Sequence, residues 1–166
     1  MNSNKKNKDI DTYSNYNTLL NISPIDGRYE NKTKGLKDFF SEFALFKYRC
    51  FIEVKYLLEL DNIKIIELTE LERKHINNIY YDFCIDDVEK IKEIELETNH
   101  DIKALEYFIR RKLENKISNK NILNYVHFAL TSQDINSSAY ILSIKNFNIT
   151  ILIPLITKVL GNLKNK

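Results

Sequence analysis

Apolar residues recur along most of the chain at the three- and four-residue spacing of amphipathic helices. Strict alternation of apolar and polar residues, which is typical of strands, is confined to residues 63–66. We interpret that short stretch as a connection between helices. The pattern therefore predicts an all-α fold.

Four helices are predicted before the last third of the chain. The first covers about residues 34–60 and is expected to bury Leu36, Phe39, Phe40, Phe43, Phe46, Cys50, Val54 and Leu57. Capping-box signatures predict a second helix from Thr69 toward Phe83 and a third from about Asp86 to Glu97. Helical spacing returns over residues 102–113, and a short helical piece covers residues 122–128.

Residues 131–166 predict one more helix, whose apolar side chains point in every direction. Pro154 is expected to kink this helix without ending it. About 30 residues span about 45 Å, more than the preceding helices can cover. Partner helices must then come from elsewhere, and we expect the chain to be the N-terminal part of a larger protein.

Composition and charge narrow the class of protein. The chain has 25 Lys and Arg against 23 Asp and Glu, scattered along the helices, which disfavours nucleic-acid binding. Cys50 and Cys84 lie far apart without a CxxC pair, so neither a metal site nor a disulfide is indicated. The apolar run at residues 149–160 contains Pro154 and Lys158 and is too short to cross a bilayer.

The domain organisation follows from these patterns. Residues 1–19 are rich in Asn, Lys and Ser, lack the apolar core of a signal peptide, and predict a disordered tail. Residues 20–130 predict an N-terminal helical domain, and residues 131–166 the truncated beginning of a helical-bundle domain. We expect a soluble, cytoplasmic protein that does not bind a membrane.

Three polar segments interrupt the helical pattern and contain groups suited to anions. In the first, at residues 23–29, Arg28 offers a guanidinium fork to a phosphate and Tyr29 a hydroxyl. Gly27 is expected to let the backbone present both side chains together. Taken alone, the segment can equally be an ordinary turn before a helix.

The second and third segments precede helices, where backbone N–H groups and the helix dipole favour anions. His100 can donate a hydrogen bond to such a group, although Asn99 or Asp101 can equally be a simple N-cap. Thr131 can cap the last helix together with Asp134, which leaves Ser132 available to a carboxylate.

The other two histidines lack comparable settings. His75 lies on a charged helical face, and His127 is expected to be an interior hydrogen-bonding residue. The co-occurrence of two helix starts and one Arg-Tyr pair favours a single polyanion site.

The sequences of these segments resemble those of the adenylosuccinate lyase family, in the fumarase/aspartase superfamily. The matching stretches are SPIDGRY, FFSEFALFKYR, ETNHDIKALEYFI and HFALTSQDIN, and the resemblance extends from about Leu20 to about Leu160. Gln133 stands where the family pattern has Glu. The resemblance implies the N-terminal helical domain and the start of a long central-bundle helix of the fumarase/aspartase fold.

The resemblance also implies a function. Family members eliminate fumarate from adenylosuccinate to give AMP, and from the succinyl-carboxamide ribotide of the purine pathway. They act as homotetramers without metal or organic cofactor. The implied substrate-binding residues are Arg28 and Tyr29 for the phosphate, Asn99, His100 and Asp101 for the pocket, and Thr131 and Ser132 for the succinyl group.

The implied catalytic segments lie elsewhere. In the family the base is a Ser on a mobile loop and the acid a His in a Thr-His-Gly segment, and neither segment occurs here. His100 is then the one candidate catalytic residue, assisting binding and orientation, and the chain alone is expected to be inactive. Two alternatives remain open: a helical protein-interaction module whose caps are only caps, and another superfamily lyase such as argininosuccinate lyase.

Overall fold

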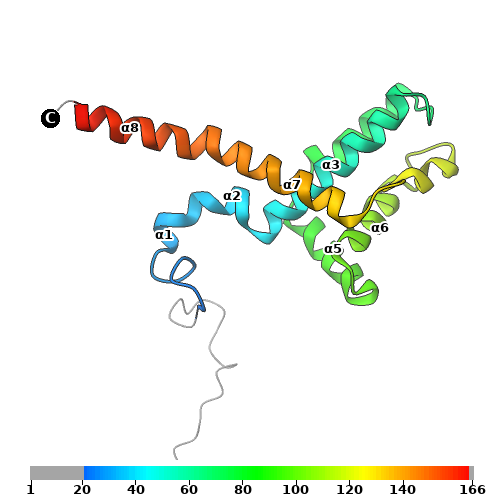
Figure 1. Ribbon diagram of the computed structural model, residues 1–166. Coiled ribbons are helices and arrows are strands. Elements are labelled where there is room, and N and C mark those ends of the chain that lie inside the picture. The colour runs from blue at the N-terminus through cyan, green and yellow to red at the C-terminus, as the bar shows by residue number, and fades with distance from the viewer. Residues whose placement is uncertain (1–20, 165–166) are drawn as a thin grey trace, which may run out of the picture. The chain divides into compact units, whose positions relative to one another are not determined.

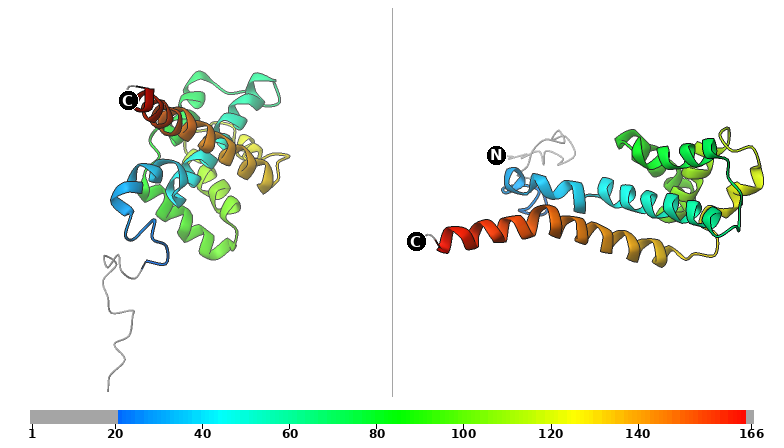
Figure 2. Two further views of the ribbon diagram at one scale, coloured as in Figure 1. Left: turned by 60° about the vertical axis from the view of Figure 1, so that its left-hand side comes forward. Right: turned by 90° about the horizontal axis from the view of Figure 1, so that it is seen from above.

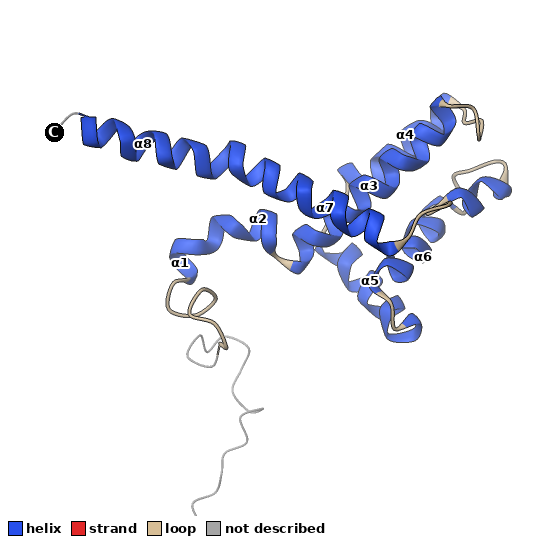
Figure 3. Cartoon of the chain, in the orientation of Figure 1, coloured by secondary structure: helices blue, strands red, loops and turns tan. Residues whose placement is uncertain are grey.

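All regular elements in the computed structural model are helical over residues 21–164, the part of the chain that it describes (Figures 1 and 3). The predicted all-α fold is confirmed. The tail predicted for residues 1–19 lies outside the described residues. The chain divides into two compact units, residues 1–37 and residues 38–166, and each is described by itself.

In its described part, residues 21–37, the first unit is a run of turns followed by short helices. These are α1 (Glu30–Thr33), the 3-10 helix η3 (Lys34–Leu36) and the first residue of α2 (Lys37–Phe40). The Thr33 hydroxyl lies 2.9 Å from the Ile25 carbonyl oxygen and 3.1 Å from that of Tyr29, so it can donate to either. Local hydrogen bonds therefore stabilise the turns at residues 25–33.

The second unit begins with α2 and the long helix α3 (Glu42–Asn62). The prediction of one unbroken helix over residues 34–60 is wrong, because Ser41 is extended and its hydroxyl oxygen accepts the Ala44 N–H at 3.1 Å. Phe46, Cys50, Val54 and Leu57 are buried as predicted. Phe40, before the break, is 53% exposed, and Leu36, Phe39 and Phe43 are only half-buried.

Three further helices complete the body of this unit: α4 (Glu70–Tyr81), α5 (Ile85–Thr98) and α6 (Asp101–Leu113), followed by the 3-10 helix η4 (Lys120–Tyr125). The capping box at Thr69 is confirmed, because Thr69 and Glu72 bond reciprocally. Helix α3 packs against α4, and α5 against α6. Their apolar faces form one core, which includes Leu57, Ile76, Ile91, Leu105 and Ile109.

The last helix is continuous from Ser132 to Lys164. It consists of α7 (Ser132–Phe147), the π-helical segment η5 (Asn148–Leu152) and α8 (Ile153–Lys164). As predicted, Pro154 does not end it. The irregularity lies directly before the proline, where the Ile153 N–H reaches back five residues to the Asn148 carbonyl.

Within residues 38–164, only the first half of this long helix packs against another helix. Helix α7 lies along α3 (Figure 2) and buries Ile135, Ala139 and Ser143. The Ser143 hydroxyl donates to the Phe39 carbonyl at 2.6 Å. Helix α8 extends away from α4, α5 and α6 and has no buried residue (Figure 1). The prediction that this helix is longer than the preceding helices can cover is confirmed.

The length of this helix also changes one expectation. The 33 residues from Ser132 to Lys164 form a helix that is long and apolar enough to cross a membrane by length and composition. The apolar run at residues 149–160, taken alone, predicts a segment that is too short to cross a membrane. Length and composition are shared by membrane spans and by helices buried inside bundles, so they do not separate the two.

Candidate functional site

The second polar segment is the junction between α5 and α6. Asn99 ends α5 in the left-handed conformation (φ 50°), which asparagine tolerates better than most residues, and its N–H donates to the Glu95 carbonyl at 2.8 Å. The residue that caps α6 is His100, whose Nδ1 accepts the Lys103 N–H at 3.2 Å. The alternative that Asn99 or Asp101 is a simple N-cap of α6 is therefore wrong.

This cap orients the His100 ring. Because Nδ1 accepts a hydrogen bond, the neutral ring has its proton on Nε2. The side chain is 49% exposed, so this Nε2–H can donate to a ligand at the start of α6. The backbone offers fewer free N–H groups to an anion than predicted, since the Ile102 and Lys103 N–H groups already donate to the side chains of Asp101 and His100.

A buried arginine joins this helix start to α7. Arg49, in the middle of α3, is 5% exposed, and its Nη2 lies 2.8 Å from Asp101 Oδ2. Its Nε donates to Asn136 Oδ1 at 2.9 Å, and the guanidinium lies over the Phe46 ring with Cζ 5.4 Å from the centroid. One guanidinium therefore holds the first residue of α6 and the first turns of α7.

The third polar segment begins α7. The N–H and hydroxyl of Thr131 donate to Asp134 Oδ2 at 2.7 and 2.9 Å, which confirms the predicted capping box. Both hydrogen bonds lower the pKa of the Asp134 carboxyl, and the one from the backbone N–H has the larger effect. Within residues 21–164 the Ser132 hydroxyl has no hydrogen-bond partner, and the N–H groups of Ser132 and Gln133 lie in the first turn, where no helical acceptor exists.

The loop that leads into α7 is fastened to α3. Glu53 is 2% exposed, and its Oε1 lies 2.5 Å from His127 Nδ1. One turn further along α3, the Tyr56 hydroxyl donates to the Phe128 carbonyl at 2.9 Å. His127 (φ 61°) and Ala129 are both left-handed, so the loop needs these anchors to keep its conformation. The expectation that His127 is an interior hydrogen-bonding residue is confirmed.

The charge of Glu53 also acts on His127. The hydrogen bond to the carboxylate raises the pKa of the imidazole, and this outweighs the opposite effect of burial. The second oxygen of Glu53 is buried and has no hydrogen-bond partner within residues 21–164. The contact with His127 is therefore the principal interaction that stabilises the Glu53 carboxylate.

The first polar segment lies in the other unit. The Tyr29 N–H donates to the Pro24 carbonyl at 2.9 Å, and the Arg28 guanidinium lies over the Tyr29 ring at 5.4 Å. The two side chains line one surface hollow of about 600 Å³. Gly27 contributes to this turn without adopting a left-handed backbone. The structure thus brings Arg28 and Tyr29 together, as predicted.

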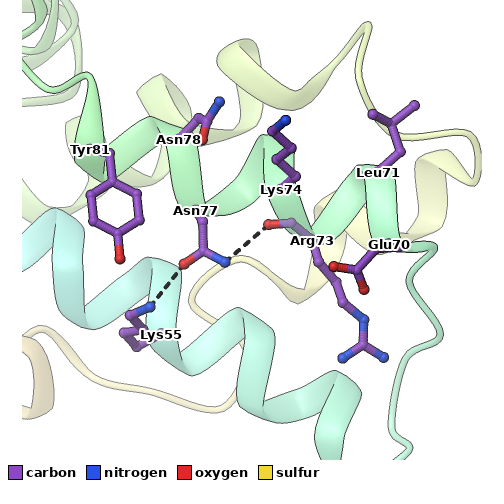
Figure 4. A pocket seen from close by; sticks show the side chains of 8 residues that line it. All are labelled: Lys55, Glu70, Leu71, Arg73, Lys74, Asn77, Asn78 and Tyr81. Carbon is purple, nitrogen blue, oxygen red and sulfur yellow. Dashed lines mark hydrogen bonds between the residues drawn. The ribbon is translucent and has the colours of Figure 1, made fainter.

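A second hollow of about 600 Å³ lies between α3 and α4 (Figure 4). Lys55 Nζ donates to Asn77 Oδ1 at 2.8 Å across its floor, and Asn77 donates in turn to the Arg73 carbonyl. Arg73 itself forms an ion pair of 2.7 Å with Asp61. Lys55 and Asn77 are thus paired with each other and Arg73 with Asp61, and none of the three predicted segments lines this hollow. No group of His, Cys, Asp and Glu within residues 21–164 could hold a metal ion.

Comparison with known proteins finds no family model that matches the chain, but it does find several similar proteins. The adenylosuccinate lyase of Buchnera aphidicola subsp. Schizaphis graminum is 47% identical over 153 residues, which cover 90% of this chain and 34% of that protein. Those of Legionella pneumophila (strain Corby) and Dictyostelium discoideum are 43% and 44% identical, over 88% and 83% of this chain and 33% and 31% of their own lengths.

The chain belongs to the adenylosuccinate lyase family. It spans about a third of the length of the curated relatives that it matches. In the second unit the predicted segments are residues 98–101 and 127–134, and Arg49 connects the first of them, through Asp101, to Asn136 just after the second. The binding roles of the seven residues implied by the resemblance stay predictions.

Two residues important to this arrangement were missed by the sequence reasoning. Arg49 and Glu53 lie one turn apart on α3, between the buried residues Phe46 and Leu57. Charged residues at core positions of an amphipathic helix are almost never buried unless they are paired. Their spacing was the signal that could have identified both.

Proposed function

We propose that this chain is the substrate-binding N-terminal part of an adenylosuccinate lyase. The complete protein would eliminate fumarate from adenylosuccinate to give AMP, and from the succinyl-carboxamide ribotide to give the corresponding carboxamide ribotide. The observation that supports this best is the joining of two helix starts through Arg49. It puts the half-exposed His100 on an element connected to Ser132, whose hydroxyl has no hydrogen-bond partner within residues 21–164.

The substrate is a polyanion with one phosphate and two carboxylates. In this proposal Arg28 and Tyr29 bind the phosphate, because a guanidinium gives bidentate, charge-assisted hydrogen bonds to phosphate oxygens. Ser132 and the free N–H groups in the first turn of α7 bind the succinyl carboxylates, because the helix dipole favours an anion there. Thr131 shapes this site through its two hydrogen bonds to Asp134.

Asn99, His100 and Asp101 form the wall of the pocket at the start of α6. His100 donates its Nε2–H to an acidic group of the substrate and orients it. The reaction needs no metal or organic cofactor in this proposal.

The proton transfers belong to other parts of the complete protein. The elimination requires a base that removes a proton beside a carboxylate and an acid that protonates the leaving nitrogen. The three histidines of this chain are His75, His100 and His127, and none stands in a Thr-His-Gly segment. We therefore expect the 166-residue chain to bind without turning over.

The unpaired helix supports assembly into a homotetramer. Helix α8 exposes apolar side chains around its circumference, including Ile153, Ile156, Val159 and Leu160. Such a helix gains most from a helical bundle, and Lys158 and Thr157 on it suit a water-soluble bundle better than lipid. We propose a cytoplasmic enzyme that binds neither a membrane nor nucleic acid.

Titration of the gene-encoded protein that contains this chain with AMP tests whether Arg28 binds the phosphate. The variant Arg28→Ala should bind AMP at least tenfold more weakly, since it loses a charge-assisted hydrogen bond. The variant Arg111→Ala is the matched control, because Arg111 is an exposed arginine in the last turn of α6. Equal affinity of both variants would refute the role of Arg28.

The same titration separates the alternatives. A helical interaction module would give no heat of specific binding with AMP or adenylosuccinate. A lyase for argininosuccinate would bind that compound and not the nucleotide.

A further inference from the structure

We propose that Arg49 is a positioning residue that holds the starts of α6 and α7 at a fixed separation, so that one ligand can reach both. The inference rests on the proposed function for the identity of that ligand. Arg49 does not contact the ligand in this proposal. It acts through Asp101 and Asn136.

The contacts of Arg49 connect α6 to α7 from a buried position on α3. Its side chain is 6% exposed and starts from the centre of α3, so it is inside the unit and cannot reach a ligand on the surface. Two different nitrogens of the guanidinium are used, Nη2 toward Asp101 Oδ2 at 2.8 Å and Nε toward Asn136 Oδ1 at 2.9 Å. Because the guanidinium is planar and rigid, these two contacts fix the distance between their acceptors.

Each acceptor stands next to a predicted site residue. Asp101 directly follows His100, and Asn136 lies four residues after Ser132, which is about one helical turn. A shift of either acceptor would therefore move a neighbouring ligand-binding group. An error of about 1 Å in such a position can cost about a hundredfold in rate.

The same contacts change the role of Asp101. Its Oδ1 accepts the Ile102 N–H at 2.8 Å, and its Oδ2 pairs with Arg49. Both oxygens are thus bonded to protein groups. We assign Asp101 to anchoring the start of α6, while His100 faces the ligand.

Arg110 provides a matched control within the same helix. Its guanidinium also binds one carboxylate and one asparagine, Glu106 Oε1 at 3.2 Å and Asn124 Oδ1 at 3.0 Å. It lies toward the other end of α6, away from the starts of both helices. The variant Arg110→Lys then measures the general effect of losing a bridging arginine.

The test compares the variants Arg49→Lys, Asn136→Ala and the double variant with Arg110→Lys in the gene-encoded protein. A lysine keeps a charge for Asp101 but cannot provide the fork, so Arg49→Lys and Asn136→Ala break the same link. We expect each to raise KM for adenylosuccinate at least fivefold, and the double variant to be no worse than either. Arg110→Lys should change KM less than twofold.

Hydrogen exchange of the Lys103 and Ala104 amides gives a readout that needs no ligand. These amides close the first turn of α6 on His100. If Arg49 links the helices, Asn136→Ala in α7 should speed their exchange at least fivefold, and Arg110→Lys should not. A residue that merely contacted the substrate would move KM without moving this exchange.

The outcomes separate this inference from the proposed function. Unchanged exchange in Asn136→Ala and Arg49→Lys overturns the positioning role, and so does a double variant whose KM effects multiply. If the wild-type protein releases no fumarate from adenylosuccinate, the proposed function fails, while faster exchange in those two variants still supports the link made by Arg49. Arg49→Met is less informative, because it leaves the Asp101 charge without a partner.

Discussion

The pairing of Glu53 with His127 predicts a pH-dependent stability. Glu53 is 2% exposed and one of its oxygens has no hydrogen-bond partner within residues 21–164, so His127 is its principal support. Removing one partner of a buried pair costs about 3–5 kcal/mol, because the other charge is left buried alone. His127 is itself 15% exposed in its side chain, so we expect about 3 kcal/mol for His127→Gln at pH 6.

The sign of the pH dependence follows from the raised pKa of His127. The stability due to the protonated ring is fully present below the ordinary pKa of 6.5 and is lost as the pH rises through the higher pKa of the folded state. The loss amounts to about 1.4 kcal/mol for each unit by which the pKa is raised. Glu106 and Lys103 also act on the ring, with opposite signs, and their effects are weaker than that of Glu53.

Urea unfolding of the chain at pH 6 and pH 9 measures this effect. The chain has ten tyrosines and no tryptophan, so tyrosine fluorescence and circular dichroism are suitable probes. The free-energy difference between wild type and His127→Gln should be larger at pH 6. The control His75→Gln, at a half-buried position on α4, should differ from wild type by less than about 0.5 kcal/mol at both pH values. Equal differences for His127→Gln at the two pH values would refute the reasoning.

Two other predictions concern acid stability and assembly. Burial alone would raise the pKa of the Glu72 carboxyl, but hydrogen bonds from the Ser118 N–H and from the N–H and hydroxyl of Thr69 lower it to about 2, against an ordinary 4.5. Its contribution of up to about 3 kcal/mol is therefore present above pH 4.5 and lost as the pH falls toward 2, and acid unfolding of Glu72→Gln should lack this loss. For assembly, Ile156→Lys on the exposed face of α8 should lower the molar mass of the gene-encoded protein in light scattering, and an unchanged mass would contradict a bundle through α8.

Local rules predicted most of the helices correctly. The capping boxes at Thr69 and Thr131 and the return of apolar residues after residue 101 each depend on neighbours within four positions, which a sequence displays directly. The break at Ser41 was missed because the apolar period continues through it. A single serine in the extended conformation ends one helix and caps the next.

The site was predicted less completely, for a physical reason. The sequence identified helix starts, since these have local signatures, but Arg49 bonds to residues 52 and 87 positions further along the chain. Such pairings depend on how the helices pack. The capping by His100 was missed because Asn and Asp are the more common capping residues.

One measurement tests the proposed function most directly: the release of fumarate from adenylosuccinate by the gene-encoded protein that contains this chain. We predict rapid release from adenylosuccinate, loss of most of that activity in Ser132→Ala, and no release from argininosuccinate. Release from argininosuccinate alone, or full activity of Ser132→Ala, would contradict the assignment of a purine substrate to the joined starts of α6 and α7.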